Sequence, residues 1–123
     1  MLSKSDIVTL HCPLTEDSKN LINQDRIAQM KKGAILINAA RGPIVDSKAL
    51  ADALNSGYLR GAGIDVFEME PPLPMDHPLL HSINTIVTPH IAFASDESME
   101  IRAEIVFENI QKWMNKEQVN IIL

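Results

Sequence analysis

Short apolar runs that alternate with helix-like segments constrain the fold of this 123-residue chain more than any other feature. Each run is rich in aliphatic and β-branched residues, as in strands that are buried in a parallel sheet. The runs cover residues 7–12, 34–38, 63–67 and 85–88. Because parallel strands need a crossover connection, strands that alternate with helices predict βαβ units and an α/β fold.

Helix signals fill the gaps between these runs. Asn23 is a favourable N-cap, and Gly33 can end the helix in a left-handed conformation, so we expect a helix between them. Asp46 or Ser47 caps a second helix, which ends before Gly57.

Two further segments complete the chain. Ser95 caps a third predicted helix with an apolar stripe of Ile101, Ile105, Val106, Ile110, Trp113 and Met114. Residues 70–78 hold four of the seven prolines and predict an irregular surface loop.

Composition excludes several classes of function. A net charge of -5 disfavours nucleic acid as a partner, and the apolar runs are too short to span a membrane. Cys12 is the single cysteine, so no internal disulfide can form and a cytoplasmic setting is expected. We expect Cys12 to be a small buried hydrophobic residue.

Three ionisable residues, Arg41, Glu70 and His90, follow predicted strands. Ligands of open α/β sheets bind outside the carboxyl ends of the strands. A guanidinium for an anion, a carboxylate and a proton carrier together indicate an acid/base site for a small carboxylate. Gly42, which comes next to Arg41, predicts a turn where the backbone approaches a ligand closely.

Each of these residues also has an ordinary structural interpretation. Arg41 could be a surface arginine or part of a salt bridge, and His90 a hydrogen-bonded structural histidine. Glu70 alone could simply be solvated. His77 and His81 have the spacing of a metal pair, but Pro78 between them favours a loop, so no metal site is predicted.

Three segments, taken together, resemble the signatures of the D-isomer-specific 2-hydroxyacid dehydrogenases. The resemblance covers residues 5–113, and the three motifs occur in the family's order and at matching spacings. The motifs are AILINAARG at residues 34–42, with Val45 and Asp46 after it, GIDVFEMEP at residues 63–71, and TPHIA at residues 88–92.

The resemblance implies a role for each member of the triplet. Arg41 would bind and polarise a 2-oxo acid. His90 would protonate the carbonyl oxygen as hydride arrives, or deprotonate the hydroxyl group in the reverse direction. Glu70 would keep His90 protonated. The implied activity interconverts D-2-hydroxy acids and 2-oxo acids, and the implied parent protein is a homodimer.

The resemblance also implies NAD as the cofactor and leaves NADP open. Asp65 would face the nicotinamide carboxamide, and the Ala39-Ala40 backbone would lie beside the ring. The full set of implied cofactor-binding residues is His11, Cys12, Pro13, Thr15, Asn38, Ala39, Ala40, Arg41, Asp65 and His90.

One family feature is missing from the sequence. The motif G-x-G-x-x-G does not occur, because Gly61-Ala62-Gly63 is followed by Val66 at its last position and precedes a strand. We therefore expect residues 1–123 to form the C-terminal portion of a Rossmann-like NAD(P)-binding domain, half of a doubly wound parallel sheet plus a C-terminal helix. The glycine-rich half and most of the substrate domain lie outside it, so the isolated chain should bind NAD(H) weakly and be inactive.

Two alternatives remain open. Some members of the family are non-catalytic, nucleotide-sensing corepressors that keep the same triplet, and the chain could also be a truncated remnant. The acidic, compact composition favours the enzyme over the corepressor, and the intact motifs argue against a decayed remnant.

Overall fold

A computed structural model describes residues 1–69 and 72–121. The chain divides into two compact units, Met1–Ile91 and Ala92–Leu123. The first unit holds the sheet, and the second holds one long helix.

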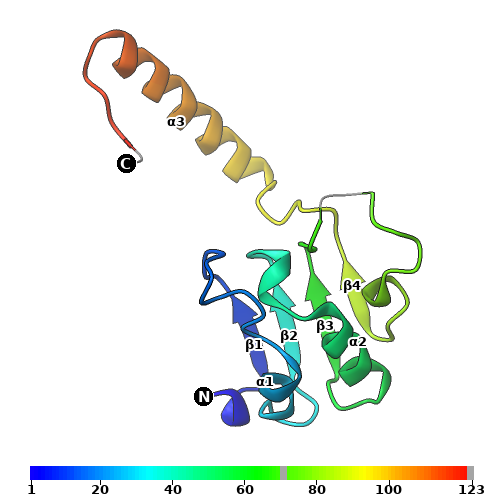
Figure 1. Ribbon diagram of the computed structural model, residues 1–123. Helices are drawn as coiled ribbons and strands as arrows, with labels where there is room; N and C mark the ends of the chain where they lie inside the picture. Colours follow the sequence, from blue (N-terminus) through cyan, green and yellow to red (C-terminus); the bar gives the residue numbers. More distant parts are fainter. Residues whose placement is uncertain (70–71, 122–123) are drawn as a thin grey trace. The chain divides into compact units, whose positions relative to one another are not determined.

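Four parallel strands form the sheet of the first unit, in the order β1-β2-β3-β4. Their arrowheads point to the same end in Figure 1. The predicted parallel α/β sheet is therefore confirmed. The strands are β1 (Ile7–Leu10), β2 (Ile35–Asn38), β3 (Gly61–Ile64) and β4 (Thr85–Val87).

The register of the strands aligns their carboxyl ends. Leu10, Asn38, Ile64 and Val87 form one row across the sheet. The ladder continues one residue further, because the Asp65 amide donates to the Asn38 carbonyl at 2.9 Å. The chain therefore leaves all four strands at the same edge.

The strand boundaries differ from those predicted. β3 covers Gly61–Ile64 rather than residues 63–67, because Gly61 pairs with Ile35 and Ile64 is the last residue in the ladder with β2. β1 ends at Leu10, two residues earlier than expected. Cys12, predicted to be buried, is half-buried because it lies beyond the strand, where it packs against the rim of the core.

The first helix, α1 (Gln24–Ala28), has the predicted cap but is shorter than predicted. Asn23 Oδ1 accepts a hydrogen bond from the Arg26 amide at 3.0 Å. The helix stops early, and Lys31 instead pairs with Asp6 beside β1 at 2.5 Å. Gly33 does adopt a left-handed φ of 82°, but in the turn that enters β2.

The second helix, α2 (Ser47–Asn55), closely matches the prediction. Asp46 is the N-cap, and its Oδ1 accepts from the Ala49 amide at 3.0 Å. Leu50 and Leu54 are both fully buried, and Gly57 follows the helix with a φ of 70°.

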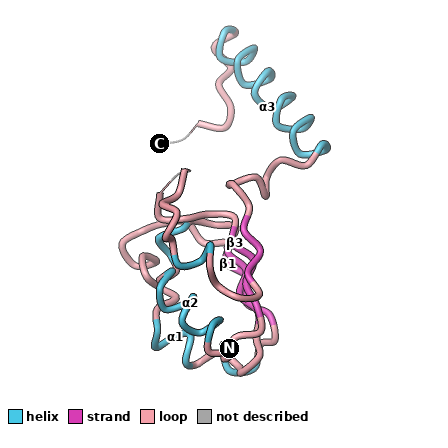
Figure 2. The backbone as a smooth tube through the Cα atoms, turned by 90° about the vertical axis from the view of Figure 1, so that its right-hand side faces the viewer, coloured by secondary structure: helices cyan, strands magenta, loops and turns pink. Residues whose placement is uncertain are grey.

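Both helices lie on one side of the strands, as Figure 2 shows. The core is on this side, where Leu36 is 0% exposed. Side chains on the opposite side are open: Ile37, the next residue of β2, is 37% exposed, and Ile86 of β4 is 73% exposed.

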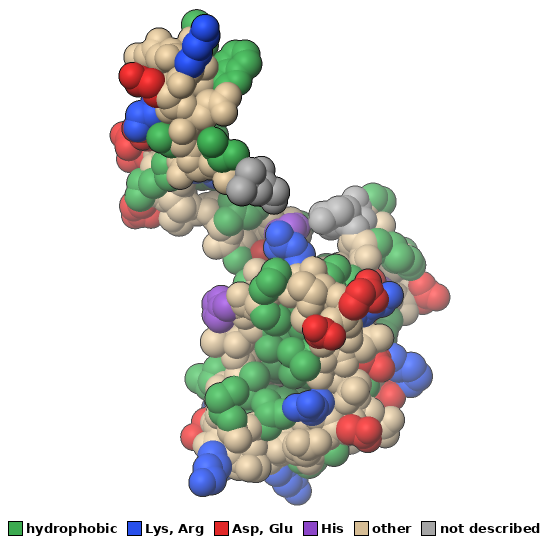
Figure 3. Space-filling view, turned by 60° about the vertical axis from the view of Figure 1, so that its left-hand side comes forward, with side chains coloured by type: hydrophobic (Ala, Val, Ile, Leu, Met, Phe, Trp, Pro, Cys, Tyr) green, Lys and Arg blue, Asp and Glu red, His purple; other side chains and the backbone are tan. Residues whose placement is uncertain are grey.

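Apolar surface also surrounds the free edge of β1. Val8, Leu10, Leu21 and Met30 contribute to the lining of a hollow of about 710 Å³. Figure 3 shows hydrophobic side chains gathered on this side of the first unit.

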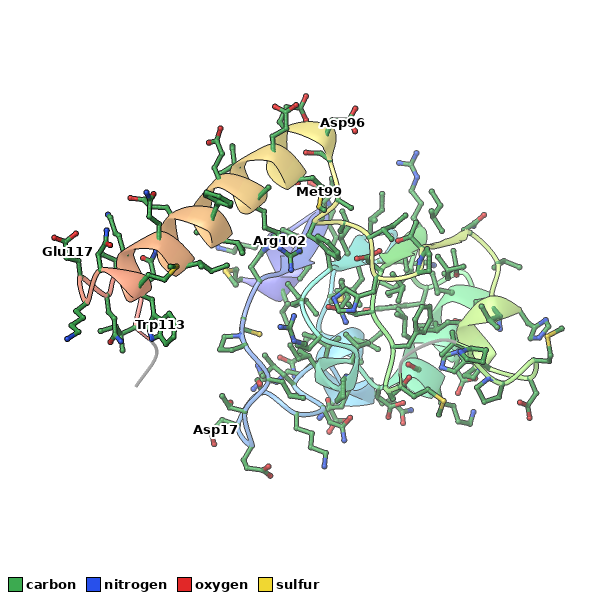
Figure 4. The ribbon with its side chains drawn as sticks, turned by 90° about the horizontal axis from the view of Figure 1, so that it is seen from above. Asp17, Asp96, Met99, Arg102, Trp113 and Glu117 are labelled. Atoms are coloured by element: carbon green, nitrogen blue, oxygen red, sulfur yellow. The ribbon has the colours of Figure 1, made fainter. Side chains whose placement is uncertain are left out.

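The second unit consists mainly of α3 (Asp96–Met114), with Ser95 as its N-cap. The predicted apolar stripe is present on this helix, but α3 has no buried residue. Met99, Arg102 and Trp113 project from the same side of the helix in Figure 4. The Arg102 guanidinium lies 4.9 Å from the centre of the Phe93 ring.

The remaining regular elements are three short 3₁₀ helices: Leu2–Lys4, Gly42–Ile44 and Pro78–Leu80. None of the helices in the described part of the chain has both the length and the hydrophobicity needed to cross a bilayer.

Neighbouring residues of β2 provide a test of this one-sided packing. Leu36→Ala removes a fully buried side chain and should lower the free energy of unfolding by about 2–5 kcal/mol. Ile37→Ala on the open side should lower the free energy of unfolding by less than half as much. Urea unfolding of the 123-residue chain measures both losses. Equal losses at the two positions would contradict this packing.

Candidate active site

The predicted site residues of the first unit gather at the carboxyl edge of the sheet. His11, Ala39, Asp65 and Thr88 each come directly after a residue of the last row across the strands. Arg41 and His90 lie in the loops that follow β2 and β4, and both loops leave the sheet at this same edge. Glu70 lies outside the described residues, so its pairing with His90 stays a prediction.

Asn38 shapes the loop that carries Arg41. Its side chain is 1% exposed, its Oδ1 accepts from the Ala40 amide at 3.1 Å, and its Nδ2 donates to the Arg41 carbonyl at 3.0 Å. The Ile44 amide donates to the same carbonyl at 3.3 Å. The backbone of Arg41 is thus held in place from two directions.

The side chain of Arg41, in contrast, is exposed. Its Nη1 donates to the Ala40 carbonyl at 2.6 Å. A guanidinium carries five N–H donors in a planar fork, so this bond leaves others to meet a carboxylate. The arrangement fits an anion-binding arginine on a fixed backbone.

Gly42 makes a close backbone approach, which in the structure is to another loop of the protein. A Cβ at this position would lie 1.8 Å from the Phe67 carbonyl oxygen and 2.6 Å from the Glu68 nitrogen. The close approach is therefore made to the loop after β3. The glycine therefore lets two loops of the protein pack directly against each other.

Asp65 organises the loop that carries His90. Its side chain is buried, and its Oδ1 accepts from the Thr88 hydroxyl at 2.5 Å and from the Ile91 amide at 2.8 Å. These two donors stand on either side of Pro89 and His90. One carboxylate oxygen therefore fixes both ends of the short segment that presents the histidine.

His90 itself has an uncommon backbone conformation. Its φ is 59°, in the left-handed region that costs most residues roughly 1–2 kcal/mol. The side chain is half-buried. Because Asp65 holds the residues before and after it, the backbone stays in this conformation, which directs the imidazole from a fixed position.

The loop after β1 has an organiser that the sequence analysis missed. Ser18 is buried, and its Oγ accepts from the Thr15 amide and donates to the Pro13 carbonyl, both at 2.7 Å. The spacing of Thr15 and Ser18 is typical of a hydroxyl-capped turn and would have indicated this role. His11 is exposed, and its Nε2 lies 2.9 Å from the Thr9 hydroxyl.

His77 and His81 take separate partners. His77 Nε2 lies 3.2 Å from Glu68 Oε2, and His81 Nε2 lies 2.6 Å from the Met75 carbonyl oxygen. Within the described residues, no group of three possible ligands could hold a metal ion.

The residues at the strand ends fit a nicotinamide ring. Ala39 is exposed and carries only a methyl group, so a flat ring can lie against the backbone after β2. The Asp65 carboxylate is an acceptor of the kind that an amide N–H needs. The loop after β4 adds an imidazole, which can move a proton.

Comparison with known proteins gives a family match. Residues 1–92 match the family model described as D-isomer specific 2-hydroxyacid dehydrogenase, NAD binding domain. The chain is 48% identical over 120 residues to a putative 2-hydroxyacid dehydrogenase of Haemophilus influenzae, covering 94% of this chain and 38% of that protein.

Solved structures agree with this match. The chain is similar to D-lactate dehydrogenase with NAD⁺ from Lactobacillus jensenii, at 34% identity and a TM-score of 0.88, over 99% of this chain and 40% of that one. It is also similar to a D-isomer specific 2-hydroxyacid dehydrogenase from Xanthobacter autotrophicus Py2 in complex with NADPH and MES, at 42% identity and a TM-score of 0.78. That match covers 97% of this chain and 48% of the other. The chain thus spans less than half the length of each of these three proteins.

The two bonds to Asp65 Oδ1 make a prediction about the histidine loop. Asp65→Ala leaves the Thr88 hydroxyl and the Ile91 amide without this acceptor and should lower the free energy of unfolding by about 3 kcal/mol. Asp65→Asn keeps an acceptor oxygen and should cost less.

The matched control is Asp6→Ala, which removes a carboxylate from the exposed pair with Lys31. Such surface pairs contribute about 0–1 kcal/mol. If urea unfolding gave Asp65→Ala no larger a loss than Asp6→Ala, the proposed hold on the loop would be wrong.

Proposed function

This chain belongs to the D-isomer specific 2-hydroxyacid dehydrogenase family, and we propose that its protein reduces small 2-oxo acids to D-2-hydroxy acids and catalyses the reverse oxidation. The observation that carries the proposal is the double hydrogen bond of Asp65, which holds His90 at the sheet edge that also carries Arg41. A proton carrier and an anion-binding group are thereby fixed on loops of one parallel sheet.

His90 is the proton donor in this proposal. Reduction of a carbonyl group delivers a hydride to carbon and requires a proton at oxygen. Imidazole is suited to this task because it gains and loses a proton near neutral pH. Because the backbone is held on both sides of His90, the imidazole stays in position during proton transfer.

Arg41 binds the substrate through its carboxylate and carbonyl oxygens. A guanidinium fork matches a carboxylate with two parallel hydrogen bonds. The Arg41 backbone is anchored by Asn38, whereas its side chain is exposed and can reach a ligand. This combination supports a role in substrate capture.

Glu70 completes the proposed set. A carboxylate beside an imidazole favours its charged form and would keep His90 ready to donate a proton. Glu70 lies outside the described residues, so the argument for it is its place in the motif at residues 63–71, which resembles the glutamate signature of the family.

NAD is the proposed cofactor, with NADP as the variant. When bound, the nicotinamide supplies the hydride. Asp65, Ala39 and Ala40 would hold the ring, since they offer an acceptor and a small surface at the strand ends. Residues proposed to line the rest of the cofactor site are His11, Cys12, Pro13, Thr15, Asn38, Arg41 and His90.

The activity, the substrate and the expected homodimer are proposed for the whole protein, of which this chain would be the C-terminal portion of the NAD(P)-binding domain. Residues 1–92 match only the NAD-binding domain. We expect the preferred 2-oxo acid to depend on residues outside this chain.

The isolated chain should bind NADH weakly. Backbone amides of a glycine-rich loop at a helix N-terminus contribute much of the affinity for a dinucleotide's phosphates, and the 123 residues lack such a loop. We expect calorimetry to give a dissociation constant well above the micromolar range. Low-micromolar binding would show that the phosphates are held by other residues.

The catalytic assignment can be tested in a chimera in which this chain replaces the matching segment of the Haemophilus relative. His90→Asn should reduce the kcat for 2-oxo acid reduction by about 10²–10⁴-fold, because the variant lacks the proton carrier. Asparagine tolerates the left-handed backbone, so the loop should stay in place. Arg41→Ala should mainly raise the KM for the 2-oxo acid.

The matched control is His81→Asn, because His81 is exposed and bonds to the Met75 carbonyl. It should leave both constants unchanged. Unaltered steady-state kinetics in the His90 and Arg41 variants would rule out the assignment.

A further inference from the structure

We propose that Glu68 and His77 are positioning residues that hold the arginine loop, residues 38–45, in the geometry that Arg41 needs to bind substrate. The expected effect on the KM rests on the proposed function, whereas the expected effect on the order of the arginine loop rests on the structure alone. Neither residue belongs to the set assigned above.

Glu68 and His77 form a defined pair. His77 is 9% exposed, and its Nε2 lies 3.2 Å from Glu68 Oε2. The Leu79 amide donates to His77 Nδ1 at 3.3 Å, so Nδ1 is an acceptor and Nε2 carries the hydrogen that is donated to Glu68. Both ring nitrogens therefore have a partner.

The ring of His77 also packs against the loop after β3. It meets the Phe67 ring edge to face, with 5.3 Å between the ring centres and an angle of 90° between the planes. A buried imidazole thus contacts two consecutive residues, Phe67 through its ring and Glu68 through its carboxylate. This fixes the backbone that joins them.

That same backbone lies against the arginine loop. The Phe67 carbonyl and the Glu68 nitrogen occupy the space where Gly42 would carry a Cβ. Gly42 directly follows Arg41, and its carbonyl accepts from the Val45 amide at 3.1 Å. A shift of the Phe67 and Glu68 backbone would therefore alter its contact with Gly42, and with it the position of Arg41.

The surroundings of Glu68 favour its charged form. Burial tends to raise the pKa of Glu68, but hydrogen bonds from Ser47, from its own amide and from His77 lower it below the ordinary value. The carboxylate that is kept charged in this way is the partner of His77 Nε2, so it joins the loop after β3 to His77.

The expected physical effect can be measured by hydrogen exchange on the 123-residue chain. Glu68→Ala should increase amide exchange in residues 39–45 of the arginine loop at least tenfold while β1 and β2 keep their protection. The control is Asp52→Ala, which breaks the exposed Lys48–Asp52 pair on α2 and should leave residues 39–45 unchanged.

The expected kinetic effect can be measured in the chimera with the Haemophilus relative. Glu68→Ala should raise the KM for the 2-oxo acid about tenfold, with a smaller change in kcat and none in the KM for NADH. Glu68→Gln should restore the KM, since its amide oxygen can still accept from His77 Nε2. A residue with a merely structural role would lower the melting temperature and leave the KM of the folded enzyme unchanged.

The outcomes separate the two proposals. Unchanged exchange in residues 39–45 in Glu68→Ala would overturn the positioning role, whatever the activity. If the chimera shows no 2-oxo acid reduction, the proposed function fails, and the exchange result still decides whether Glu68 holds the loop. Should Glu68→Ala fail to fold, His77→Gln, which weakens the same pair, replaces it with the same expected changes.

Discussion

The in-register pairing of four parallel strands is the constraint on which the site depends. Because Leu10, Asn38, Ile64 and Val87 stand in one row, each loop leaves the sheet at the same level. Residues that are far apart in sequence then need only short loops to meet. A slip of one residue in one strand would turn its side chains to the other face of the sheet and displace the loop that follows it.

Two contacts fix the loops at this common edge relative to one another. Asp65 joins the end of β3 to the segment after β4, and Gly42 lets the loop after β2 touch the backbone at Phe67. The loops after three neighbouring strands are therefore connected to one another and not only to the sheet. Loops that carry functional groups are often mobile, and such cross-connections reduce the disorder that a ligand would otherwise have to remove.

The sequence was sufficient to predict the element order, the parallel sheet and the caps at Asn23 and Ser95, because each depends on local pattern. It could not predict that Gly42 meets a neighbouring loop, since a glycine before proline is equally consistent with a ligand contact. The hold of Asp65 on the loop after β4 was also missed, because it joins residues 23 and 26 positions apart. Non-local contacts of this kind leave no periodic signal in a sequence.

The open side of the sheet exposes apolar residues of the same strands that end at the site. α1 and α2 cover one face, whereas Ile37 and Ile86 on the other remain in contact with water. Any apolar surface that binds there favours the folded strands by mass action, with a gain that grows with its concentration relative to its dissociation constant. The same strands end at Asp65 and the arginine loop. A ligand on the open face would therefore stabilise the strands that end at the site, without touching any residue that takes part in the chemistry.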